Sequence, residues 1–222
     1  FSDILVIPES LGMKFQLIPS IGPVFEKPFT KTDSIESLNF DENYFKNIYS
    51  GIKQIKKSLN NEKALIGFSG SPWTIACYMI EGKPSKDYRN LRSLIYEDPT
   101  SYHHLMTKLT DSIITYIKGQ ITSGVDVVQI FDTNASYLSK ENFEKFSFPY
   151  LKRIIQAINM TKTPSILFVK GGGHWLDLLK TINANVLGID WTIPIKNAKN
   201  ILQDSVSIQG NLDPSVLLAS NS

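Results

Sequence analysis

Six short apolar runs recur along the chain, and helical patterns lie between them. The runs are rich in Val, Ile, Leu and Phe and lack strict polar–apolar alternation, which is typical of strands buried on both faces, as in parallel sheets. They cover residues 4–7, 64–68, 127–131, 165–169, 186–189 and 206–208. This repeated alternation of strand and helix predicts an α/β fold with a parallel sheet.

Helices are expected where apolar side chains recur at helical spacing. Asp41, Ser139 and the pair Asp98-Pro99 are start signals, because Asp and Ser cap helices and Pro suits the first turn. Gly124 should end the helix that follows Asp98, and Pro149 should kink or split the one that follows Ser139. The remaining expectations are short helices over residues 175–182 and 194–202, and a hairpin or irregular excursion over residues 13–29.

The number of strands favours a barrel. A (β/α)8 TIM barrel occupies about 250 residues, and this chain has six strand patterns in 222 residues, with both ends cut in mid-pattern. We therefore expect a single domain over residues 1–222, a TIM barrel that lacks material at each end. The competing fold is an open doubly wound sheet, but no Gly-rich phosphate loop follows the first run, as a dinucleotide-binding half would require.

Charge and cysteine content exclude several function classes. The net charge is +2, from 23 basic and 21 acidic residues, which gives no electrostatic case for binding nucleic acid or an anionic membrane. No apolar run approaches the roughly 18 residues that span a bilayer. The single cysteine, Cys77, excludes an internal disulfide and a Cys-based zinc cluster, and a reducing, cytoplasmic setting is the simpler interpretation.

Residues suited to a binding site follow every predicted strand. In a barrel, chemistry collects where strands end, and each of these places carries Gly, Asp or an amide. Each is also a common turn residue, but six such places on one face favour a site. They are Asp3 and the segments 67–73, 131–134, 170–174, 188–191 and 209–214.

These segments resemble the uroporphyrinogen decarboxylase family. The matching blocks stand in the family's order and spacing over essentially the whole chain. They are FSDIL (1–5), GFSGSPWT (67–74) with YMIEG (78–82), QIFDT (129–133), FVKGGG (168–173), GIDWT (188–192) and QGNLDP (209–214).

The resemblance implies a (β/α)8 barrel that is usually a homodimer and acts in porphyrin and heme biosynthesis. Such an enzyme removes CO2 from the four acetate side chains of uroporphyrinogen III and gives coproporphyrinogen III, with no metal and no organic cofactor. Aligned on the motifs, this chain covers family strands two to seven, and the first and eighth are absent.

The resemblance also assigns roles to five residues. Asp3 would accept hydrogen bonds from pyrrole N–H groups and offset the positive charge of a protonated pyrrole, which is electrostatic stabilisation by a fixed charge. Tyr78 would hydrogen-bond a substrate carboxylate or Asp3, and Thr133 would bind a substrate carboxylate. Phe68 and Phe131 would line an apolar floor. Purely structural roles stay open: a turn or cap for Asp3 and Thr133, and packing for the three aromatic residues.

Other candidates are weaker. His103 and His104 lie on a long helix with no acidic partner, His174 is peripheral, and the glycines at 171–173 lack a following Gly-Lys-Ser/Thr pattern. Cys77 is expected to be a buried packing residue.

Two alternatives to a working decarboxylase stay open. One is an inactive fragment, because the family's Arg-x-x-x-Arg pair and late His are absent, and an open barrel exposes two sheet edges that favour aggregation. The other is a corrinoid-dependent methyltransferase of the same superfamily, which needs a zinc-bound thiolate that Cys77 alone cannot provide.

Overall fold

Five parallel strands form one sheet in the computed structural model, which describes residues 3–219. Within these residues the strands pair in chain order: β3 (Ile66–Gly70), β4 (Val127–Asp132), β5 (Ser165–Val169), β6 (Val186–Gly188) and β7 (Ser207–Gln209). The order never reverses, so the topological switch point of a doubly wound sheet is missing from this part of the chain. Consecutive parallel strands with intervening helices are the units of a (β/α)8 barrel, as predicted.

The described part of the barrel is not closed. β3 and β7 form the edges of the five-stranded sheet within residues 3–219. Each edge presents backbone groups that a further strand could pair with. The structure is therefore part of a TIM barrel.

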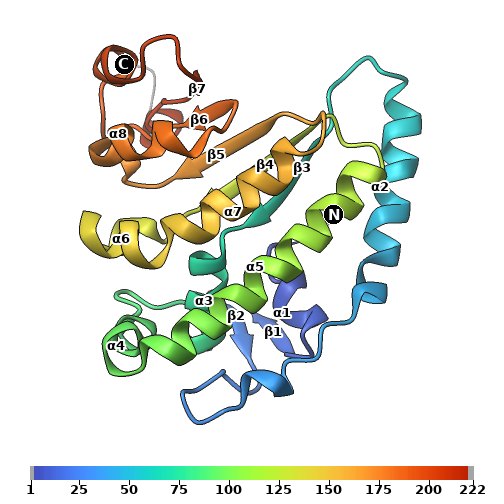
Figure 1. Cartoon of the computed structure of the whole chain (residues 1–222). Helices are drawn as coiled ribbons and strands as arrows, with labels where there is room; N and C mark the ends of the chain where they lie inside the picture. Colours follow the sequence, from blue (N-terminus) through green and yellow to red (C-terminus); the bar gives the residue numbers. More distant parts are fainter. Residues whose placement is uncertain (1–2, 220–222) are drawn as a thin grey trace.

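Helices connect the strands, and the two longest of these connecting helices lie side by side along the sheet. Figure 1 shows α5 and α7 running next to each other in front of the strands, and the two helices are in contact. The connecting helices are α3 (Pro72–Glu81), α4 (Arg89–Glu97), α5 (Pro99–Thr122), α6 (Lys140–Phe146), α7 (Phe148–Asn159), α8 (Leu176–Leu179) and α9 (Ile195–Leu202). Short 3-10 helices are η1 (Ile35–Ser37), η2 (Glu42–Phe45), η3 (Ala135–Tyr137), η4 (Gly172–Trp175), η5 (Lys180–Ile182) and η6 (Pro214–Leu218).

The predicted helix boundaries are confirmed. Asp41 caps η2, which leads into α2 (Lys46–Leu59), and the Asp98 carboxylate caps α5 by accepting the Ser101 N–H at 3.0 Å. Ser139 caps α6 in the same way. Pro149 lies in the first turn of α7, so the chain splits into two helices at Ser147. α4 is a helix that the sequence patterns did not predict.

The prediction of a strand over residues 4–7 is wrong. The chain forms a short helix there, α1 (Val6–Ser10). The Asp3 carboxylate accepts the Leu5 N–H at 2.9 Å, and its carbonyl accepts the Val6 N–H at 3.3 Å, which starts a turn. Pro8 lies in the first helical turn, where its missing N–H costs nothing, whereas in a strand it would remove a ladder hydrogen bond.

The second barrel strand is therefore not formed by residues 3–219, which supply the third to the seventh. Phe1 and Ser2 of the FSDIL block lie outside the described residues. The prediction of a hairpin is confirmed: β1 (Phe15–Ile18) and β2 (Gly22–Phe25) pair antiparallel. The Phe25 N–H donates to the Gly82 carbonyl at 2.7 Å, which docks the hairpin on the end of α3.

The two faces of the sheet differ in burial. In β4, Val128, Ile130 and Asp132 are buried, while the residues alternating with them are half-exposed. Because successive side chains in a strand point to opposite faces, the first set packs under the helices and the second lines an uncovered face. Among the described residues, no helix is both long and apolar enough to cross a membrane.

Candidate functional site

Three phenylalanines form a row across the uncovered face of the sheet, near the carboxyl ends of the strands. Phe131 pairs in register with Phe168, and their ring centroids lie 6.1 Å apart in an edge-on contact. Phe68 makes a similar contact with Phe131 at 6.3 Å. All three side chains are half-buried. Phe68 and Phe131 thus lie where an apolar floor is expected, and a third ring extends that surface.

Asp3 lies over the end of β3. Ile4 packs against Gly70, the last residue of that strand: a Cβ built on Gly70 would lie 3.2 Å from the Ile4 Cδ1. Glycine at this position therefore lets the segment that carries Asp3 cross close above the strand end. Asp3 is exposed, and its Oδ1 accepts the Leu5 N–H. The expected turn role of Asp3 is thus real, and its other carboxylate oxygen has no hydrogen bond within residues 3–219.

Tyr78 lies close enough to Asp3 for their charges to interact. Burial within α3 raises the pKa of Tyr78, and the negative charge of Asp3 raises it further because a phenolate beside a carboxylate is unfavourable. The Tyr78 side chain is half-buried. The first two residues that the sequence singled out are therefore within electrostatic reach of each other.

Polar residues follow the ends of β4 to β7, beyond the phenylalanines. We call Thr133, Lys170, Asp190 and Asn211 the polar row. Asp132 pairs with Val169, and the Lys170 N–H closes this last pair by donating to the Asp132 carbonyl at 3.2 Å, so Thr133 and Lys170 directly follow the paired ends of neighbouring strands. Asp190, two residues beyond the end of β6, contacts the segment after β5, since its carboxylate accepts the Gly171 N–H and feels the charge of Lys170. Asn211, two residues beyond the end of β7, contacts Asp190 by donating to its carbonyl.

Asp190 organises one end of this row. Its Oδ2 accepts the Gly171 N–H at 2.6 Å, and its Oδ1 accepts the Thr192 N–H at 3.0 Å. Burial would raise the pKa of Asp190, but these hydrogen bonds, the Thr192 hydroxyl and the charge of Lys170 outweigh it and hold the pKa below its usual value. Asn211 donates to the Asp190 carbonyl at 3.0 Å. The carboxylate is thus ionised and fully engaged in shaping the loops.

Asp132 lies away from the polar row, although it belongs to the same QIFDT block as Thr133. Its side chain is fully buried on the covered face and accepts hydrogen bonds from the hydroxyls of Ser71, Thr74 and Ser147 at 2.7–2.9 Å. Burial raises the pKa of Asp132, and these three hydroxyls oppose the rise. Asp132 therefore joins the end of β4 to the starts of α3 and α7 and is inaccessible to a ligand. Thr133, the next residue, is exposed.

The weaker candidates stay outside the site. Cys77 is fully buried, and burial raises the pKa of its thiol well above the usual value, so the thiolate that binds metal is disfavoured. Within residues 3–219 no cluster of three or more His, Cys, Asp or Glu side chains could hold a metal ion. His103 Nδ1 lies 2.5 Å from the Tyr150 hydroxyl and its ring stacks with Phe146, so His103 joins α5 to α6 and α7.

The glycines at 171–173 serve packing. Gly171 gives its N–H to Asp190. A Cβ on Gly172 would lie 2.9 Å from Leu179, and one on Gly173 would lie 2.8 Å from Ile193. These close approaches explain the glycines without a bound phosphate.

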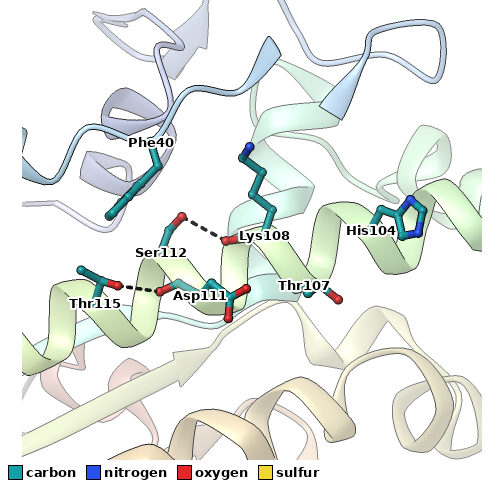
Figure 2. Close-up of a pocket in the computed structure, with 7 residues that line it drawn as sticks. All are labelled: Phe40, His104, Thr107, Lys108, Asp111, Ser112 and Thr115. Carbon is teal, nitrogen blue, oxygen red and sulfur yellow. Dashed lines mark hydrogen bonds between the residues drawn. The ribbon is translucent and has the colours of Figure 1, made fainter. Parts of the chain in front are cut away.

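Two hollows contrast in position. One of 420 Å³ lies over α5 and Phe40; Figure 2 shows its lining side chains. Its Ser112 and Thr115 hydroxyls donate to carbonyls of their own helix, at Lys108 and Asp111, so they do not converge on a ligand. The other, of 880 Å³, lies at the exits of β6 and β7 between residues 191–194 and 210–213. Only the second adjoins the polar row.

Comparison with solved structures supports the barrel. The chain superimposes on a methyltransferase from Methanosarcina mazei with a TM-score of 0.79 and 16% identity, covering 96% of this chain and 63% of that one. At this identity the likeness shows the fold alone. A B12-independent methionine synthase from Shewanella sp. W3-18-1 is similar more distantly, with a TM-score of 0.51 and 13% identity, over 88% of this chain and 56% of that one.

Comparison of sequences identifies the family. A family profile described as uroporphyrinogen decarboxylase (URO-D) matches residues 1–222. Proteins named uroporphyrinogen decarboxylase from Dechloromonas aromatica and Dichelobacter nodosus are 40% and 42% identical to this chain and cover 99% and 98% of it. The chain spans 63% of the length of each of these relatives. The chain therefore belongs to the uroporphyrinogen decarboxylase family.

Proposed function

We propose that the protein to which this chain belongs is a uroporphyrinogen decarboxylase. It would convert uroporphyrinogen III to coproporphyrinogen III by removing CO2 from four acetate side chains, as a cytoplasmic homodimer in heme biosynthesis. The observation that carries this proposal is the family match over residues 1–222, which includes the Asp3 block. The proximity of Asp3 and Tyr78 at the strand ends supports it.

The proposed chemistry needs no cofactor because the substrate ring accepts the electrons. A proton adds to a pyrrole carbon, the bond to the carboxylate breaks, and its electron pair flows into the cationic ring as CO2 leaves. A second proton converts the exocyclic carbon to a methyl group, and the ring carbon then loses its proton. Asp3 would stabilise the cation, since a fixed negative charge acts where positive charge develops.

The other residues would bind and orient the substrate. The phenylalanine row, with Phe68 and Phe131, offers an apolar surface for the macrocycle. The Tyr78 and Thr133 hydroxyls would hydrogen-bond substrate carboxylates from the segments that follow β3 and β4. An apolar floor with polar groups above it suits a large ring that carries acidic side chains.

The test is turnover by the complete product of the gene. The purified protein is incubated with uroporphyrinogen III without air, and the products are oxidised to porphyrins and separated by carboxylate number. We expect porphyrins with seven to four carboxylates. Unchanged substrate would contradict the proposal, and turnover by the complete protein but not by residues 1–222 alone would identify this chain as an inactive part of an active enzyme.

A further inference from the structure

Lys170 directly follows β5, at the carboxyl end of the sheet. The five or so residues that follow each of β3, β4, β5, β6 and β7 include a single Lys or Arg, and it is Lys170. The other residues of the polar row are a hydroxyl, a carboxylate and an amide. The row therefore has one positive charge within the part of the chain that the structure describes.

The alternation of β5, carried one residue beyond the strand, points Lys170 toward the uncovered face. Phe168 lies on that face and Val169 is buried under the helices, so alternation returns Lys170 to the side of Phe168. The same alternation in β4 puts Thr133 on the side of Phe131. Because Asp132 pairs with Val169, Thr133 and Lys170 each lie one residue beyond this last registered pair, at the exits of neighbouring strands and two residues beyond the Phe131–Phe168 pair.

The Lys170 ammonium is available for a direct partner. The residue is exposed, and within residues 3–219 it forms no ion pair. Its charge reaches Asp190 and helps to hold the pKa of that carboxyl down, which agrees with a position beside it in the row. The two Asp190 oxygens, however, are already occupied by Gly171 and Thr192.

We infer that Lys170 and Thr133 form a subsite for one carboxylate side chain of the substrate. Lys170 supplies a charge-assisted hydrogen bond, and Thr133 supplies a hydroxyl donor on the neighbouring strand. The phenylalanine pair below them supports the ring that carries this side chain. The inference rests on the proposed function and adds a cation to it.

The test compares Lys170→Met and Lys170→Arg with a matched control, Lys152→Met, in the complete protein. Lys152 is an exposed lysine of α7. Removing one partner of a charge-assisted hydrogen bond should raise the KM for uroporphyrinogen III about tenfold and change kcat little. The difference should shrink as salt is added, and Lys170→Arg should recover most of it. An unchanged KM in Lys170→Met, or an equal rise in Lys152→Met, would overturn the inference.

A binding measurement separates this inference from the proposed function. Uroporphyrin, with eight carboxylates, and its methyl ester serve as probes, and quenching of tryptophan fluorescence reports binding. Weaker binding of the acid but not of the ester by Lys170→Met supports the subsite even if the protein shows no turnover. Equal affinity of wild type and variant for the acid overturns the subsite, and failure of the wild type to bind uroporphyrin overturns both proposals.

Discussion

Asp132 and Asp3 are two carboxylates at the same end of the sheet with opposite surroundings. Asp132 is fully buried and receives three hydroxyl donors, whereas Asp3 is exposed and its carboxylate receives one backbone N–H. Burial keeps a ligand away from the first carboxylate, and the second has one oxygen without a hydrogen bond within residues 3–219. The family's sequence blocks thus contain both kinds of carboxylate, and burial distinguishes the residue that holds the scaffold from the one available for chemistry.

The same contrast holds for the two faces of the sheet. The covered face is sealed by α5 and α7, which Figure 1 shows lying along the strands. The uncovered face presents the phenylalanine row and, above it, Thr133 and Lys170. Ligand-binding groups therefore gather on the face that the helices leave free, at the carboxyl ends of the strands, where barrel enzymes place their sites.

The largest expected effect is on stability, from Asp132→Ala. The substitution leaves three buried hydroxyls without their acceptor, so the free energy of unfolding should fall by about 3 kcal/mol. Urea denaturation of the complete protein measures the change. Asp204→Ala, which removes an exposed carboxylate of the loop before β7, is the control and should change stability by less than about 0.5 kcal/mol. Equal stability of the two variants would mean that Asp132 does not hold the scaffold and would contradict its contrast with Asp3.

Asp3→Asn should lower activity and leave stability almost unchanged, the reverse of Asp132→Ala. Asn keeps an oxygen to accept the Leu5 N–H, so the free energy of unfolding should stay within about 0.5 kcal/mol of the wild type. The charge that stabilises the pyrrole cation is lost, and kcat for uroporphyrinogen III should fall at least about 100-fold. Steady-state kinetics and urea denaturation on the same preparation test both halves. Near-normal kcat would refute the role assigned to Asp3.

Local signals in the sequence predicted most of the scaffold. Five of the six apolar runs are strands because buried parallel strands need continuous apolar residues, and Asp98 and Ser139 start helices because capping is a local interaction. Residues 4–7 are the one apolar run that does not form a strand. Their side chains are as apolar as those of a strand, but Asp3 and Pro8 favour a turn, and this local preference decided the structure.

The site was predictable only in part. The family resemblance singled out Asp3 and Tyr78, which the structure places close together, although their roles stay predictions. The sequence predicted the segments that carry the polar row, but not which of their residues are neighbours, since that depends on the pairing of β4, β5 and β6, which a single sequence does not reveal. The burial of Asp132 did have a signal in the sequence, because strand alternation puts it on the face opposite to Phe131.

Tyr78→Phe sharpens the comparison at the accessible end of the sheet. The variant keeps the ring and removes the hydroxyl that would bind a substrate carboxylate or Asp3. We expect kcat/KM for uroporphyrinogen III to fall about tenfold, as for the loss of one hydrogen bond to a charged group. Tyr137→Phe, on η3, is the control because Tyr137 is exposed. A fall of similar size in both variants would contradict a specific role of the Tyr78 hydroxyl in binding the substrate or Asp3.

The smallest effect is a titration that tests whether Asp3 and Tyr78 are neighbours. The negative charge of Asp3 disfavours the Tyr78 phenolate, so Asp3→Asn should lower the pKa of Tyr78 toward the usual value of a tyrosine. Subtracting the alkaline ultraviolet titration of Tyr78→Phe from that of the parent isolates this one phenol, in both the wild-type and the Asp3→Asn backgrounds. Burial contributes to the raised pKa as well and is unchanged by the substitution, so the pKa should remain above the usual value in both. An identical pKa in the two backgrounds would mean that the carboxylate does not act on the phenol, and the pair could not serve as one binding unit.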